Sequence, residues 1–175
     1  LFHPLRLERD RAYAWLTEQA ECAALADSDG DNLTGTLVTL PVLYHPLVAP
    51  DLEWLADQKN MSLDQIVALH TGTTYFAYAT GFAPGFCYLG DVPAELATPR
   101  LANPRAAVPA GAVGLADRQT AVYPGISPGG WRLIGSCPRP LFQGGDHPTA
   151  CLAVGDSVQF EAITTKEYRR LGGEL

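Results

Sequence analysis

The sequence predicts a mainly β protein made of short strands joined by tight turns. Of its 175 residues, 17 are glycine and 14 are proline, and these 31 turn-forming residues match in number the 12 basic and 19 acidic residues. Such a content of chain-breaking residues argues against a helical bundle. Apolar residues make up 47% of the chain, which is enough for a buried core. The length allows one domain, with or without a small appendage.

The first elements are a helix and a strand. Apolar residues spaced among charges predict a helix from Leu7 to Leu25. The run from Thr34 to Leu40 has the β-branched and aliphatic residues of a strand, and we expect Pro41 to end it.

Two short helices follow. Asp51 is in the position of an N-cap for a helix from Leu52 to Asn60. Ser62 and Gln65 have the spacing of a capping box, which predicts a second helix from Leu63 to His70.

The rest of the chain is rich in β-like segments. The strongest is Thr73 to Thr80, and a last turn of helix is expected over Lys166 to Arg170. The weaker segments are Ala107–Val108, Ala112–Leu115, Ala121–Tyr123, Trp131–Ser136 and Ser157–Ile163. Short strands broken by glycine and proline predict a small barrel or a sandwich.

The charge is unevenly distributed along the chain. The net charge is −7, and there is no basic run, which argues against binding to nucleic acid or to an anionic membrane. Residues 81–148, however, hold 21 of the 31 glycines and prolines and carry five arginines against four acids, so the remainder carries −8. This turn-rich segment is therefore compatible with an anionic ligand or an acidic partner.

Several familiar motifs are missing. The cysteines at 22, 87, 137 and 151 form no C-x-x-C pair and lack zinc-site spacing, so we expect reduced thiols in a cytoplasmic protein. The four histidines are far apart, and we predict no metal site. The chain contains no phosphate-binding glycine loop. Gly125 to Gly129 matches G-x-S-x-G, but Pro128 follows Ser127 and has no N–H for an oxyanion hole, so a serine hydrolase is not favoured.

From Leu40 onward the chain resembles the family of the 5-oxoprolinase B subunit, which includes Kip-type inhibitors of sporulation kinases and proteins called allophanate hydrolase subunit 1. The matching blocks stand in family order and cover about three quarters of the chain. They are LPVLY (40–44), the DL–LA helix (51–56), the helix ending in His70, TGFAPGFCYLG (80–90), TPRLANPRAAVPAGAVGLA (98–116), AVYPGISPGGWRLIGSCP (121–138) and VGDSVQFEAI (154–163).

The resemblance implies a cyclophilin-like β-barrel preceded by a small α/β domain. We assign residues 37–175 to the barrel and residues 1–36 to a partial N-terminal α/β segment. The family has a longer N-terminal domain, and this sequence begins at Leu1 rather than at methionine. We therefore expect that part of that domain is absent from this chain.

The resemblance also implies a function, with two alternatives. The main hypothesis is the B subunit of a heteromeric, ATP-dependent 5-oxoprolinase, a lactam hydrolase that converts 5-oxo-L-proline to L-glutamate. It would act with C-like and A-like subunits as partners and be inactive alone. The alternatives are a Kip-type histidine-kinase inhibitor and a carboxyltransferase subunit of an allophanate hydrolase or urea carboxylase. Assays with 5-oxoproline, a kinase domain or urea separate the three.

Two residues are predicted to be catalytic. His70 ends a helix, where the dipole favours a protonated imidazole suited to acid–base chemistry. Arg105, like Arg100, follows a proline, and its guanidinium suits a carboxylate or phosphate. The predicted substrate-binding residues are Phe82, Pro84, Gly85, Phe86, Arg100, Tyr123, Ser127, Gly129, Gly130 and Trp131. Each candidate also has a structural interpretation: a structural histidine for His70, ion pairs for the two arginines, core packing for the aromatic residues, and turns for the serine, proline and glycines.

Overall fold

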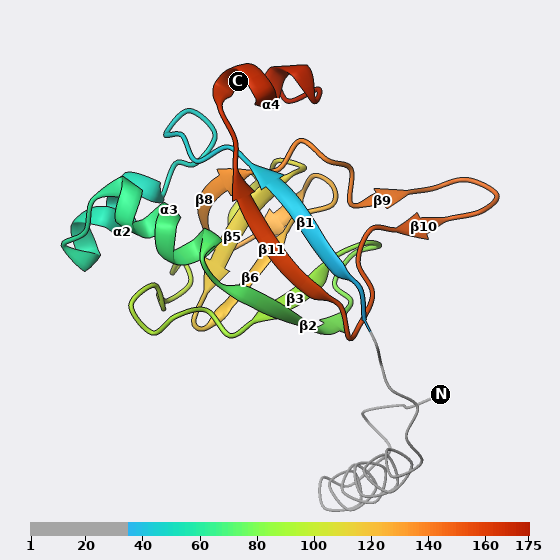
Figure 1. Cartoon of the computed structure of the whole chain (residues 1–175), viewed down its shortest axis with the longest axis horizontal. Helices are drawn as coiled ribbons and strands as arrows, with labels where there is room; N and C mark the ends of the chain where they lie inside the picture. The colour runs from blue at the N-terminus through green and yellow to red at the C-terminus, as the bar shows by residue number, and fades with distance from the viewer. Residues whose placement is uncertain (1–34) are drawn as a thin grey trace, which may run out of the picture. The chain divides into compact units, whose positions relative to one another are not determined.

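A computed structural model describes residues 35–175, which form a β-barrel with three short helices (Figure 1). The main sheet has the strand order β1-β11-β2-β3-β6-β5-β8. Its strands are β1 (Leu37–Val42), β2 (Thr74–Thr80), β3 (Cys87–Gly90), β5 (Ala112–Ala116), β6 (Gln119–Val122), β8 (Arg132–Ser136) and β11 (Ser157–Ala162). The predicted helix from Leu7 to Leu25 and most of the predicted N-terminal segment lie outside the described residues. The boundary after residue 36 stays a prediction.

The sheet closes on itself through its two outer strands. β1 runs parallel to β11, as Figure 1 shows for the blue and red strands, and the other neighbours in the sheet are antiparallel. Just beyond β1, the backbone of Leu43 exchanges two hydrogen bonds with Ser136 at the end of β8, at 2.8 and 2.9 Å. This bridge joins the two edges of the sheet. The predicted mainly β barrel is confirmed.

Two small ribbons and three helices complete the fold. β4 (Arg105–Val108) pairs with β7 (Ser127–Gly129), and β9 (Phe142–Gln143) pairs with β10 (Thr149–Ala150) in a hairpin that extends from the barrel in Figure 1. Helix α2 (Leu52–Lys59) lies against β8 and α3 (Leu63–Thr71) against β11, while α4 (Thr165–Arg170) follows β11. In residues 35–175, none of the helices combines the length and hydropathy that a bilayer span requires.

The prediction that Pro41 ends the first strand is wrong. Pro41 lies inside β1 and is the partner of Glu161 in β11. Proline is tolerated in a strand where its missing N–H does not interrupt a ladder. Within the described residues β1 has a full ladder on one side only, because its other side meets β8 at a single bridge.

Caps at the two central helices differ from one another. The capping box of α3 is confirmed, because Ser62 accepts from the backbone N–H of Gln65 and the side chain of Gln65 accepts from Ser62. Asp51 occupies the N-cap of α2, but its side chain makes no capping hydrogen bond, so the predicted capping role is wrong. Its carboxylate instead accepts from Arg105 and from the backbone of Leu133.

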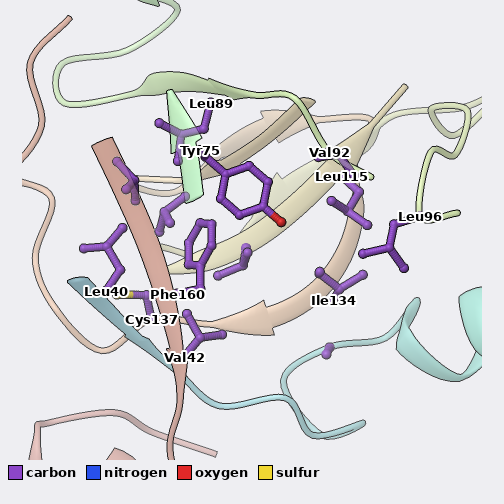
Figure 2. Close-up of a cluster of buried hydrophobic side chains, with 14 of the residues drawn as sticks. Leu40, Val42, Tyr75, Leu89, Val92, Leu96, Leu115, Ile134, Cys137 and Phe160 are labelled. Atoms are coloured by element: carbon purple, nitrogen blue, oxygen red, sulfur yellow. The ribbon is translucent and has the colours of Figure 1, made fainter. Parts of the chain in front are cut away.

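The barrel interior is filled by aliphatic and aromatic side chains. Figure 2 shows Tyr75 from β2 and Phe160 from β11 among them, with ring centroids 5.5 Å apart. Side chains of α2 and α3, including Leu52, Leu55 and Ile66, belong to the same buried cluster. The helices are therefore held to the barrel by shared apolar surface, whose burial is the main stabilising contribution.

Candidate functional site

His70 lies inside the barrel core and has no exposed surface. Its ring stacks on Phe160 with centroids 4.4 Å apart. Nδ1 is 2.7 Å from the hydroxyl of Tyr44, and Nε2 is 3.1 Å from the hydroxyl of Thr120. The side chain is thus enclosed by partners from β2, β6, β11 and the segment after β1.

The hydrogen bonds assign the tautomer of His70. Thr120 donates its only hydroxyl proton to the carbonyl of Gly114, at 3.0 Å, so it can only accept from Nε2. Nε2 therefore carries the ring proton, and Nδ1 accepts from Tyr44. Burial lowers the pKa of His70 to about 3. The expectation of a protonated ring at the helix end is wrong, because desolvation outweighs the helix dipole. The catalytic role of His70 stays a prediction, and the geometry favours packing.

A second cluster brings together several of the predicted binding residues. Phe86 lies at its centre, with ring centroids 5.4 Å from Tyr123 and 5.8 Å from Trp131. These three side chains are almost completely buried and belong to a second apolar cluster. Arg100 places its guanidinium 5.7 Å from the Trp131 ring centroid, within cation–π range. Most of this aromatic surface is core, so its predicted contact with substrate stays a prediction.

Phe82 is the exposed member of this cluster. The residue is 59% exposed, and its ring centroid lies 5.2 Å from that of Phe86 and 6.4 Å from that of Tyr123. Its backbone has a φ of 68°, a region that costs a bulky residue about 1–3 kcal/mol. The loop therefore presents an aromatic side chain at a strained position next to solvent.

Pro84 and Gly85 face a different hollow from the aromatic cluster. With Phe82 they line an open pocket of about 640 Å³ between the loop after β2 and residues 150–154. Gly85 has a φ of 81°, and a Cβ there would lie 2.6 Å from Cβ of Phe142. This close approach to the β9 strand requires glycine, so the position has a structural reason of its own.

The β4–β7 ribbon carries the predicted turn residues. Gly129 is paired with Arg105, and a Cβ at residue 129 would lie 2.9 Å from two carbons of the Tyr123 ring. The carbonyl of Gly130 accepts from the N–H of Leu101 at 2.7 Å. The hydroxyl of Ser127 is buried and has no partner in the described residues.

Arg105 is held by an ion pair at the start of α2. Its Nη2 donates to both carboxylate oxygens of Asp51, each at 2.9 Å, and its Nη1 donates to the carbonyl of Trp131 at 3.2 Å. Asp51 is 5% exposed, whereas the Arg105 side chain is 27% exposed. The guanidinium thus bridges a buried carboxylate and the protein surface.

Asp51 also binds β8. It accepts from the N–H of Leu133 at 2.6 Å and lies 3.6 Å from Nη1 of Arg132. The Arg132 guanidinium stacks on Trp54 of α2, 3.6 Å from the ring centroid. This Asp51 cluster, formed by Asp51, Arg105 and Arg132, has one negative and two positive side chains. It therefore leaves a net positive charge fixed at this end of α2.

An open pocket of about 780 Å³, which we term the α4 pocket, lies beside this cluster. Its walls come from β4, the turn before β5, the segment after β8, and α4 with the residues that follow it. Its charged lining groups are the side chains of Arg105, Arg139 and Glu174 and the terminal carboxylate of Leu175. Five prolines at 50, 109, 124, 138 and 140 make much of the wall apolar.

The sequence-predicted site residues thus form groups with different surroundings. Arg105 and Tyr123 line the α4 pocket, and Phe82 borders the pocket at residues 150–154. His70 packs against Tyr75 and Phe160 of the barrel core. Asp51, Arg132, Trp54 and Arg139 were missed as candidates. Asp51 begins one of the matching blocks but was interpreted only as a helix cap, Arg139 directly follows another block, and no local signal marks the contacts of either residue.

The described residues show no grouping of three or more His, Cys, Asp or Glu side chains that could bind a metal ion. Cys87, Cys137 and Cys151 are free thiols. Burial raises the pKa of Cys87 and of Cys137 to about 11, so neither is an activated nucleophile.

Comparison with known proteins agrees with the fold. Residues 1–152 match the family of carboxyltransferase domains, subdomains C and D. A Bacillus subtilis protein named as the B subunit of 5-oxoprolinase is 43% identical over 132 residues, covering 75% of this chain and 55% of that protein. One of the same name from Escherichia coli O157:H7 is 45% identical over 123 residues, covering 70% and 56%. The chain spans a little over half the length of these relatives.

Solved structures agree as well. A conserved protein from Pyrococcus horikoshii superposes with a TM-score of 0.73 at 36% identity, covering 96% of this chain and 75% of that one. Urea amidolyase from Kluyveromyces lactis superposes with a TM-score of 0.65 at 17% identity, covering 78% and 10%, and shows a shared fold alone. The predicted resemblance is confirmed: the chain belongs to the family of carboxyltransferase domains, subdomains C and D.

Proposed function

We propose that this chain provides the barrel of the B subunit in a heteromeric, ATP-dependent 5-oxoprolinase. The observation that carries the proposal is its 40–45% identity to three bacterial proteins named as B subunits of 5-oxoprolinase. The aligned stretches are 123–132 residues long, which is nearly the length of the barrel. The proposed reaction opens 5-oxo-L-proline to L-glutamate, and the proposed partners are a C-like subunit and an A-like subunit.

The chemistry explains why such a reaction would consume ATP. The amide bond of a five-membered lactam is unstrained, so opening the ring releases little strain energy to drive hydrolysis. ATP supplies a phosphoryl group for the amide oxygen, which makes the carbonyl carbon easier for water to attack. Because the proposed reaction needs ATP, the proposed location of the complex is the cytoplasm.

The α4 pocket is the part of this chain that suits an anionic small molecule. Arg105 is oriented by Asp51 and by the Trp131 carbonyl, and it reaches the pocket surface. The sequence has no glycine-rich phosphate loop, and so we assign the nucleotide to one of the partners or to an interface. In this assignment Arg105 binds and orients the substrate, and the chain alone has no turnover.

Reconstitution tests the proposal. The gene product that carries this chain is purified with its A-like and C-like partners, and ATP hydrolysis and glutamate release are measured with and without 5-oxoproline. We expect 5-oxoproline-dependent turnover with all three components and none when any one is omitted. Turnover that does not need this chain, or no turnover by the complete set, would refute the proposal.

Arg105→Lys is the informative variant because it keeps a cation beside Asp51 and loses the planar donor arrangement. We expect turnover to fall at least about tenfold, the effect of losing one charge-assisted hydrogen bond of about 1.4 kcal/mol or more. Arg118→Gln is the control, since Arg118 is 60% exposed and lies outside the α4 pocket. Equal activity of Arg105→Lys and the unchanged protein would exclude a role for Arg105.

A further inference from the structure

The α4 pocket has two arginines with unused hydrogen-bonding capacity. A guanidinium has five N–H groups. The hydrogen bonds of Arg105 use Nη1 once and Nη2 twice, so Nε and one Nη1 proton have no acceptor among residues 35–175. Arg139 makes one long contact, 3.5 Å from the carbonyl of Thr39. Both side chains therefore have donors left for a ligand.

Neither lining arginine is paired with an acidic group of the pocket itself. Asp51 neutralises one of the two charges beside it, since Arg105 and Arg132 share its carboxylate. Across the described part of the chain, no carboxylate lies within 4 Å of Arg139, and no ion pair joins Glu174 to either lining arginine. Within the described residues, the two lining cations thus face the Glu174 side chain and the terminal carboxylate of Leu175, and neither acidic group is paired with them.

The rest of the lining restricts what the anion can be attached to. Proline, alanine, leucine and valine side chains make up much of the rest of the wall and offer apolar contact to a compact ring. The hydroxyls of Ser136 and Tyr168 are 2.8 Å apart and are engaged with each other. A pocket with apolar walls and a few placed cations is typical of a site for a small organic acid.

We propose that the α4 pocket is a carboxylate-binding subsite in which Arg139, with Arg105, binds the carboxylate of a small cyclic amide acid. The apolar wall contacts the ring of the ligand. Under the proposed function, on which this inference rests for the identity of the ligand, that molecule is 5-oxoproline. Arg139 is then a binding residue of the substrate site, and Asp51 is a positioning residue that holds Arg105 toward it.

Titration of the 175-residue chain by two-dimensional NMR tests the subsite without ATP or partners. The probes are L-5-oxoproline, 2-pyrrolidinone, which is the same lactam without the carboxylate, and inorganic phosphate. We expect saturable shifts from 5-oxoproline at residues of the α4 pocket, and binding of 2-pyrrolidinone weaker by about tenfold or more. Equal binding of the two lactams, or shifts confined to other surfaces, would overturn the inference. Phosphate that competes with equal affinity would overturn the assignment to a carboxylate.

Arg139→Gln separates the charge from the fold, because Arg139 is exposed and its loss leaves no buried partner unpaired. We expect it to weaken 5-oxoproline binding about tenfold, Arg139→Lys to restore part of the affinity, and the exposed Arg118→Gln to leave it unchanged. An unchanged affinity in Arg139→Gln would refute the subsite.

The binding and turnover assays fail independently. Arg139-dependent binding by a chain whose reconstituted complex hydrolyses no ATP would support the subsite and reject the proposed function. A complex with normal turnover in which Arg139→Gln leaves KM for 5-oxoproline unchanged would support the proposed function and reject the subsite.

Discussion

The buried His70 should make folding of this chain sensitive to acid. Burial lowers its pKa to about 3, against an ordinary value of 6.5. Because the unfolded chain binds a proton that the folded chain excludes, stability is full above pH 6.5 and falls as the pH drops toward 3. The two pKa values give a loss of about 2 kcal/mol between pH 8 and pH 5. This loss comes from one side chain, which its burial keeps neutral in the folded chain.

His70→Gln isolates this contribution from that of the carboxylates. Glutamine keeps a donor for Thr120 but leaves the Tyr44 hydroxyl without its acceptor and removes the stacking on Phe160. We expect a deficit of roughly 2–4 kcal/mol at pH 8. At pH 5 the deficit should shrink by about 2 kcal/mol, because glutamine does not titrate.

Urea unfolding followed by tryptophan fluorescence, at pH 8 and pH 5, measures both quantities. His147→Gln, on the exposed hairpin, is the matched control and should follow the unchanged protein at both pH values. The reasoning would be refuted by a deficit of His70→Gln that is the same at both pH values, since a constant difference means that no proton uptake by His70 is linked to unfolding.

Two further predictions concern the Asp51 cluster and the β4–β7 ribbon. Asp51→Ala should lower the free energy of unfolding by roughly 3–5 kcal/mol, because it leaves Arg105 and Arg132 without their shared carboxylate. Asp91→Ala, in an exposed pair with Arg118, should change it by less than about 1 kcal/mol in the same urea experiment, and equal effects would contradict the assignment. Gly129→Ala should cost about 1–3 kcal/mol through its clash with the Tyr123 ring, whereas Gly125→Ala, whose Cβ would have nothing within 4 Å, should leave the melting temperature nearly unchanged.

Much of the secondary structure could be predicted from local patterns. The capping box at Ser62, the long β run at 74–80 and the final helix after Thr164 depend on neighbouring residues, and the structure contains all three. β3 was missed, because glycines and prolines around it hide a strand of four residues. Its pairing with β2 and β6 holds these residues in a strand conformation that their own sequence does not indicate.

The candidate site was predictable in composition more than in arrangement. The turn-rich blocks did contain residues that meet in space, including Phe82, Phe86, Arg100, Tyr123 and Trp131. Their burial could not be predicted, because aromatic residues beside glycines are equally suited to a core and to a pocket wall. The α4 pocket combines Arg105 with Arg139 and the residues after α4, which no local motif connects.

The sequence by itself determined that the chain is a turn-rich β protein resembling the B subunit of 5-oxoprolinase, because glycine, proline and strand patterns act over a few residues. The tertiary structure alone decided the state of the two predicted catalytic residues. His70 is kept neutral by its burial and oriented by Tyr44 and Thr120, and Arg105 is held by Asp51, 54 residues away in sequence. Charge state and orientation depend on burial and on distant partners, and these exist only once the barrel has closed.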